Sequence, residues 1–144
     1  MEEKRRWWAR EVFDLLEEAA TIVEEARRAN DVLVLRGACD RVERAVYLMY
    51  TVSLFPRRIR SYSQAWWAYG ELRRRFPDCE ALVEGMLAFQ RLRANRPSRS
   101  RREINASFDD FANWISTIRQ MAETLFSRVG LRDLVRVAPL PTVK

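Results

Sequence analysis

Histidine is absent from this 144-residue sequence, and only two residues are cysteine. Histidine is the commonest general base at neutral pH and the commonest metal ligand in proteins. Its absence excludes Ser-His and Cys-His nucleophilic systems, and together with two isolated cysteines it excludes a tetrahedral zinc site. We therefore expect a binding or scaffolding protein with no cofactor and no bound metal, rather than an enzyme.

Glycine and proline are also scarce, with four and five residues, and the glycines are scattered along the chain. This excludes a glycine-rich phosphate-binding loop. The low content of glycine and proline, together with 48% hydrophobic residues, indicates an all-helical protein with a substantial core. Cys39 and Cys79 are expected to be small buried hydrophobic residues. The N-terminus lacks the apolar run of a signal peptide, and no uncharged stretch is as long as a membrane span, so we expect a cytoplasmic protein that does not contact a membrane.

Apolar residues recur at spacings of three and four along most of the chain. The pattern predicts five helices, over residues 3–29, 32–54, 63–76, 79–94 and 104–129. Asp31 and Asp78 are predicted N-caps. Short connections between such helices favour an all-α, up-and-down bundle of four or five antiparallel helices. Residues 1–130 would form this single domain, and residues 131–144 a short helical turn followed by an extended tail.

Two pairs of acidic residues lie three positions apart, Asp14 with Glu17 and Asp40 with Glu43. An all-helical magnesium-dependent nucleotide pyrophosphohydrolase uses pairs of this kind. At about 100° per residue, however, both pairs lie on the far side of their helices from the apolar stripe. A shared metal site in a bundle core needs inward carboxylates. We therefore expect these side chains to be solvated and to pair with arginines of their own helix, as Asp40 would with Arg36 and Arg44.

Arginine makes up 24 of the 26 basic residues. Residues 1–55 carry nine basic and eleven acidic residues, whereas residues 56–144 carry seventeen and nine. This asymmetry suggests a surface that faces a polyanion or an acidic partner, and the alternative is a charged surface without a ligand. A preference for arginine also fits a thermophilic or high-GC source.

The candidate binding residues come from basic segments that surround the third and fourth predicted helices. Guanidinium groups bind phosphate oxygens through a planar set of donors. Six arginines and no acid lie within residues 91–102. Arg73, Arg74 and Arg75 end the third predicted helix, where they also stabilise the helix dipole. The candidates are Arg57, Arg58, Arg60, Arg91, Arg93, Asn95, Arg96, Arg99, Arg101 and Arg102.

Four aromatic residues, Tyr62, Trp66, Trp67 and Tyr69, lie between two of these basic segments and could stack on nucleic-acid bases. The alternative is that Trp66 and Tyr69 belong to the core and that only Trp67 lies at the rim. Charge alone does not separate a ligand-free surface from a nucleic-acid-binding one.

The layout resembles the HEPN superfamily of prokaryotic helical bundles over residues 5–128. The resemblance rests on a tryptophan-rich first helix, on the segment Gly37–Ala45, on the segment Phe89–Asn95 and on a long, regular last helix. Active members are metal-independent ribonucleases, usually with the site at a dimer interface. They carry an arginine, often followed by a polar residue, and a histidine a few positions later. The resemblance implies that Arg93 is the matching arginine and Asn95 the polar companion, and the missing histidine implies a non-catalytic member that keeps a basic cleft.

These observations leave three functional hypotheses. The leading one is a non-catalytic helical bundle that binds RNA or another polyanion through residues 91–102. The second is an interaction module that docks an acidic protein, for example a nucleotidyltransferase in a toxin–antitoxin or defence system, as the resemblance implies. The third, a ribonuclease without histidine, is the least favoured. A homodimer is expected from the resemblance and from the number of tryptophans, which a small bundle does not easily bury.

Overall fold

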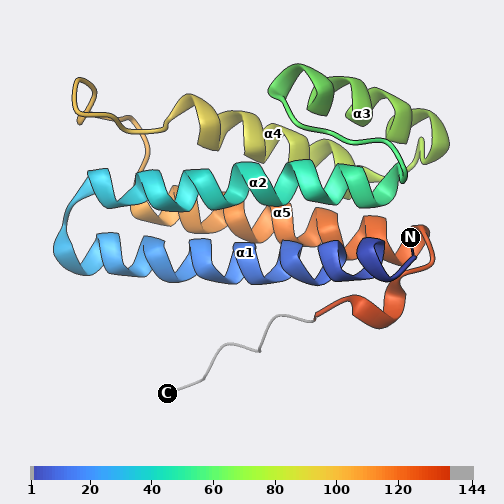
Figure 1. The fold of residues 1–144 in the computed structure, drawn as a ribbon. Coiled ribbons are helices and arrows are strands. Elements are labelled where there is room, and N and C mark those ends of the chain that lie inside the picture. The colour runs from blue at the N-terminus through green and yellow to red at the C-terminus, as the bar shows by residue number, and fades with distance from the viewer. Residues whose placement is uncertain (1, 137–144) are drawn as a thin grey trace.

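A computed structural model describes residues 2–136 of the chain (Figure 1). Five α-helices and two short 3-10 helices follow one another along these residues: α1 Glu2–Ala29, η1 Val32–Val34, α2 Leu35–Ser53, α3 Tyr62–Arg75, α4 Glu80–Ala94, α5 Phe108–Arg128 and η2 Arg132–Leu134. The prediction of an all-α bundle is confirmed. The short turn expected after residue 130 is η2, and the expected tail over residues 137–144 lies outside the described residues.

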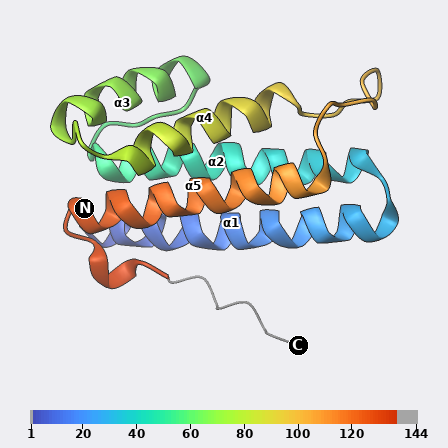
Figure 2. The same ribbon diagram turned by 180° about the vertical axis from the view of Figure 1, so that it is seen from behind.

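Four helices form the body of the bundle, and α3 lies on its outside. Helix α1 packs mainly against α2, α4 packs mainly against α5, and α1 also contacts α5. The connection over residues 54–61 runs back along α3 before that helix begins, so α3 points in the same direction as α2 (Figures 1 and 2). Buried Ile59 fixes this connection, because its backbone N–H donates to Thr51 Oγ1 at 3.0 Å. Within residues 2–136, no helix is long and apolar enough to span a membrane.

The helix boundaries follow local capping, and two of them differ from the prediction. Asp31 is an N-cap as expected, since its carboxylate accepts a hydrogen bond from Leu33 N. The predicted cap Asp78 is wrong: Cys79 occupies the N-cap position of α4. The predicted start of the last helix at residue 104 is also wrong. Ser107 and Asp110 form a reciprocal capping box, with side-chain to backbone distances of 3.1 and 2.8 Å, which sets the start of α5 at Phe108.

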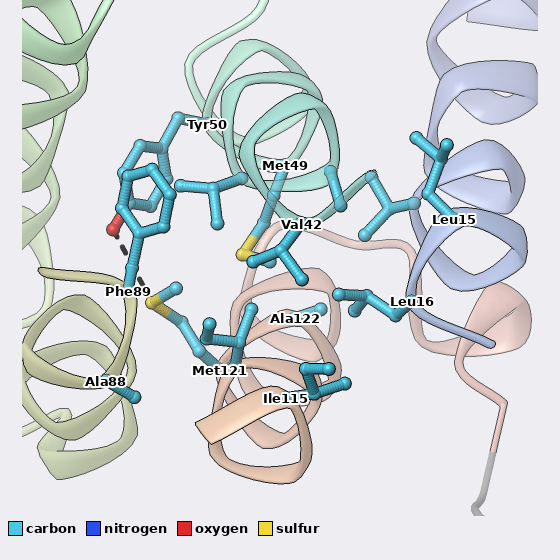
Figure 3. Close-up of a cluster of buried hydrophobic side chains, with 14 of the residues drawn as sticks. Leu15, Leu16, Val42, Met49, Tyr50, Ala88, Phe89, Ile115, Met121 and Ala122 are labelled. Atoms are coloured by element: carbon cyan, nitrogen blue, oxygen red, sulfur yellow. Dashed lines mark hydrogen bonds between the residues drawn. The ribbon is translucent and has the colours of Figure 1, made fainter. Parts of the chain in front are cut away.

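Tyr50 of α2 joins three helices at the centre of the core (Figure 3). Its ring is completely buried beside Phe89, and its hydroxyl donates to the sulfur atoms of Met86 and Met121 at 3.3 and 3.5 Å. Burial raises the pKa of this phenol well above its usual value. A thioether is a weak acceptor, so packing of the ring rather than the hydrogen bond dominates the stabilisation at this position.

Both cysteines are free and buried, as the composition predicts. Burial raises the pKa of the Cys39 thiol to about 12. The thiolate, which is the reactive form of cysteine, is therefore suppressed at neutral pH.

Helices α4 and α5 approach each other closely at Gly85. A Cβ atom placed on Gly85 would lie 2.5 Å from Met121 Cβ, whereas a Cβ atom on Gly70 of α3 would meet no atom within 4 Å. Of these two glycines, only Gly85 is required by helix packing, at the contact between α4 and α5.

These two glycines provide a matched test of the packing. We expect Gly85→Ala to lower the free energy of unfolding by up to about 2 kcal/mol, because overpacking costs about 1–3 kcal/mol and alanine returns about 1 kcal/mol of helix propensity. Gly70→Ala should raise it by about 0.5–1 kcal/mol, because only the helix propensity changes. Urea unfolding followed by circular dichroism measures both. Stabilisation of equal size by the two substitutions would contradict the close contact between α4 and α5.

Candidate nucleic-acid interface

An aromatic ladder with an arginine at each end runs along α3, with its two tyrosines packed partly against the core. The ladder consists of Tyr62, Trp66 and Tyr69, whose neighbouring rings meet edge to face at centroid distances of 6.2 and 5.5 Å. At one end the guanidinium of Arg93, from the end of α4, lies 3.8 Å from the centroid of Tyr62. At the other end Arg73 lies over Tyr69 and donates to its hydroxyl at 3.2 Å. Spacings of four, three and four residues place the three rings and Arg73 on one side of the helix.

Trp66 is 36% exposed and Trp67 42% exposed, whereas Tyr69 is half-buried. The alternative that Trp66 belongs to the core is therefore wrong, whereas Tyr69 packs partly against the core, as that alternative expects. The reason is the position of α3 outside the four-helix body, because its buried residues are then only Ala65, Ala68 and Leu72.

A second stack of arginine on tryptophan lies beside the ladder. The Arg57 guanidinium lies 4.6 Å from the ring centroid of Trp67, and Arg58 lies 4.8 Å from that of Trp8. Such cation–π contacts stabilise by about 0.5–1 kcal/mol at exposed sites. They hold the guanidinium groups in place while the edges of these groups remain able to donate hydrogen bonds.

The connection over residues 95–107 is folded. Ser98 and Arg101 form two backbone hydrogen bonds of 3.0 Å with each other, which places Arg99 and Ser100 at the tip of a tight turn. The Arg101 guanidinium donates to the carbonyl of Ala94 at 2.9 Å. This turn projects at the end of the bundle where α1 leads into α2 (Figure 1).

Arg96 anchors the connection to α2 through an ion pair with Asp40. The hydrogen bond to Asp40 raises the pKa of this guanidinium. Asp40 is thus exposed, as predicted, but it pairs with Arg96 rather than with Arg36 or Arg44 of its own helix, as the prediction had it. Glu43 accepts a hydrogen bond from the Tyr47 hydroxyl at 2.8 Å.

The other acidic pair also lies outside the core. Asp14 and Glu17 of α1 contact Arg136 at 2.6 and 3.3 Å. Within the described part of the chain, no cluster of three acidic or cysteine side chains is arranged to hold a metal ion. The two acidic pairs are therefore held in ion pairs or hydrogen bonds at the surface.

The predicted site residues separate into groups. Arg93, Arg96 and the 57–60 segment lie near one another along α2, α3 and the end of α4, whereas Arg73, Arg74 and Arg75 lie at the opposite end of the molecule from the 95–107 connection (Figure 1). Arg91 lines a different groove, between α4 and α5. The Asn95 side chain donates to the carbonyl of Arg91 at 2.9 Å and so caps α4. The amide donor of Asn95 is therefore used within the fold.

Of the nine predicted arginines, only Arg96 forms an ion pair with a carboxylate among the described residues. Three of the others, Arg60, Arg99 and Arg102, are exposed and have no ion pair within residues 2–136. Arg60 lies just before α3, whereas Arg99 and Arg102 lie in the 95–107 connection. The aromatic spacing of four and three in α3 was the sequence signal for the ladder, but the contact of Arg93 with Tyr62 had no sequence signal.

Comparison with protein-family models, with curated proteins and with solved structures yields no match to this chain.

The ion pair between Arg96 and Asp40 predicts how firmly the 95–107 connection is held. We expect Asp40→Asn to speed tryptic cleavage within residues 96–102 by up to about fivefold, because a surface ion pair contributes up to about 1 kcal/mol. Mass spectrometry of timed digests locates and times the cleavage. Asp78→Asn, an exposed acidic residue outside this connection, serves as the control. Equal cleavage rates in the two variants would show that Asp40 does not hold the connection.

Proposed function

We propose that this chain is a non-catalytic helical bundle that binds single-stranded RNA through the aromatic ladder of α3 and the exposed arginines beside it. The single observation that supports this most is the continuous series Arg93, Tyr62, Trp66, Tyr69, Arg73 along α3, with the exposed Trp66 at its centre. Bases of a single strand stack on exposed rings, and arginines next to the rings bind the phosphates.

The electrostatics of the surface favour a polyanion. The stacked guanidinium groups of Arg57 and Arg93 are held by rings rather than by carboxylates, so a phosphate would not have to displace an acidic partner. Arg60, Arg99 and Arg102 add exposed positive charge. Each phosphate that these groups neutralise releases condensed counterions, which makes the affinity fall as the salt concentration rises.

The relationship to the HEPN superfamily is part of this proposal. It is supported by the all-helical order and by the exposed place of Arg93 at the end of α4, next to Tyr62. The sequence has no histidine to act as a general acid or base beside Arg93, so we propose binding without cleavage. Cytoplasmic localisation and a homodimeric assembly stay predictions.

A second candidate function is docking of an acidic protein, such as a partner in a toxin–antitoxin or defence system. The projecting turn with Arg99 at its tip favours this alternative, since it is accessible to a folded partner. The two functions differ in what they require of α3. Stacking on Trp66 matters for RNA, whereas a protein that docks on the turn does not need the ladder.

Fluorescence anisotropy of a labelled single-stranded RNA over a salt series tests the proposal. Trp66→Ala should weaken binding by about 1–3 kcal/mol without changing the salt dependence, because it removes one stacking contact. The double variant Arg99→Ala/Arg102→Ala should instead reduce the slope of log affinity against log salt by about 1.4, at about 0.7 per phosphate contact.

Two matched variants control this experiment. Trp7→Ala removes a tryptophan that is 56% exposed on α1, and Arg28→Ala together with Arg36→Ala removes two exposed charges outside the proposed surface. Neither control should change the affinity by more than about twofold. If Trp66→Ala behaved like Trp7→Ala, the ladder would not bind RNA. If only the arginine variant lost affinity, and only for an acidic protein, docking would replace the proposal.

A further inference from the structure

A pocket lined by three arginines lies between α2 and the connection that precedes α3. Its volume is about 500 Å³, which is within the range of pockets that hold one small ligand or chemical group. Buried Ile59 fixes the connection against α2, and Arg58 and Arg60 on either side of this residue both line the pocket. Arg44 lines it from α2, together with Leu48 one helical turn later.

The three arginines of this pocket have a binding capacity that the fold does not use. Arg44, Arg58 and Arg60 are exposed, and none of them forms an ion pair within residues 2–136. The guanidinium of Arg58 lies 4.8 Å from the ring centroid of Trp8, and this contact holds it without neutralising its charge. Three guanidinium groups around one pocket favour a ligand group with more than one negative charge.

The pocket lies next to the Tyr62 end of the aromatic ladder. Tyr47, which lines the pocket, and Tyr62 both meet the ring of Phe89 edge to face, at centroid distances of 6.2 and 5.9 Å. Arg60 belongs to both features, because it lines the pocket while its backbone N–H donates to Gln64 Oε1 of α3 at 2.6 Å. A strand stacked on the ladder would therefore reach the pocket at the Tyr62 end.

Carboxylates line the part of the pocket that lies beyond the ladder. Asp40 and Glu43 precede Tyr47 in α2 by two turns and by one turn. Helix α3 begins level with the middle of α2, so the ladder does not extend over these residues (Figure 1). Arg96 neutralises Asp40, whereas Glu43 has no ion pair among the described residues. A strand that continued past the pocket would bring further phosphates toward Glu43, and this repulsion favours a strand that ends in the pocket.

We propose, on the basis of the proposed function, that this pocket binds the terminal phosphate of an RNA strand whose bases stack on the ladder. A terminal phosphate is a monoester with a charge of about −1.5 to −2 at pH 7, whereas a phosphate within the strand carries a single charge. Its three terminal oxygens accept hydrogen bonds from the guanidinium groups of Arg44, Arg58 and Arg60. The preferred ligand is therefore a phosphorylated strand end rather than any stretch of RNA.

Fluorescence anisotropy with three internally labelled, uridine-rich strands of one sequence tests the proposal. One strand carries a 5′-phosphate, one a 3′-phosphate, and one a hydroxyl at both ends. One of the two phosphorylated strands should bind about tenfold more tightly than the hydroxyl-ended strand, because only a terminal phosphate makes the additional charge-assisted hydrogen bonds. The gain should occur at one end alone, since the direction of the strand on the ladder decides which end enters the pocket.

Two arginines of α2 provide a matched pair of variants. Arg44→Ala should remove the gain and leave the affinity for the hydroxyl-ended strand within about twofold. Arg36→Ala removes an exposed arginine of the same helix that does not line the pocket, so the gain should persist. Inorganic phosphate, added at constant ionic strength, should lower the affinity of the phosphorylated strand toward that of the hydroxyl-ended one. Circular dichroism of each variant checks that the helices are retained.

Three results would overturn the proposal: no gain at either end, equal gains at both ends, or a gain that survives Arg44→Ala. Equal gains would mean that the added charge acts without the pocket. Tight binding of uridine monophosphate without any gain for the strands would assign the pocket to a free phosphate ester and overturn its link to RNA. Failure of the proposed function looks different, because the hydroxyl-ended strand would then not bind the parent chain at all. That result would overturn both proposals.

Discussion

Helices α1, α2, α4 and α5 pack closely around a core to which α3 contributes little. The rest of the structure depends on this constraint. Tyr50 and the contact of Gly85 with Met121 join α2, α4 and α5 into a core that is already filled. The fully buried residues of α3 are only Ala65, Ala68 and Leu72, and Tyr62 and Tyr69 pack against that core with part of their surface. The two tryptophans of α3, Trp66 and Trp67, therefore lie at the surface, and the half-buried rings of Tyr62 and Tyr69 flank Trp66.

The arginines adapt to the two sides of the molecule in different ways. On the side of α1, where acidic residues are frequent, arginines such as Arg136 form ion pairs with carboxylates. Near α3, where acids are scarce, Arg57 and Arg93 instead lie over aromatic rings. An ion pair neutralises the charge of a guanidinium, whereas stacking on a ring leaves the charge available. The stacked arginines are thus the ones that a phosphate-containing ligand can use.

Much of the fold could be predicted from the sequence, because apolar spacing and local stop residues determine where helices form. The start of α5 could not, because Ile104 continues the apolar spacing while the capping box at Ser107 breaks the helix. The site was predictable only in part. Spacing shows which residues of α3 share a side, but it does not show that α3 lies outside the core, so the exposure of Trp66 was not foreseen. The stacking of Arg93 on Tyr62 joins two helices and depends on the tertiary fold.

The most direct test of the account is ultraviolet cross-linking of the full chain to a uridine-rich single-stranded RNA, followed by tryptic digestion and mass spectrometry. Cross-links without a spacer form between a base and the side chain on which it stacks. Tryptic cleavage after Arg60 and Arg73 releases residues 61–73, which carry Tyr62, Trp66, Trp67 and Tyr69 in one peptide. The account predicts that the cross-linked nucleotide is found on this peptide. Cross-links confined to other peptides, or none at all under conditions in which the RNA is bound, would contradict it.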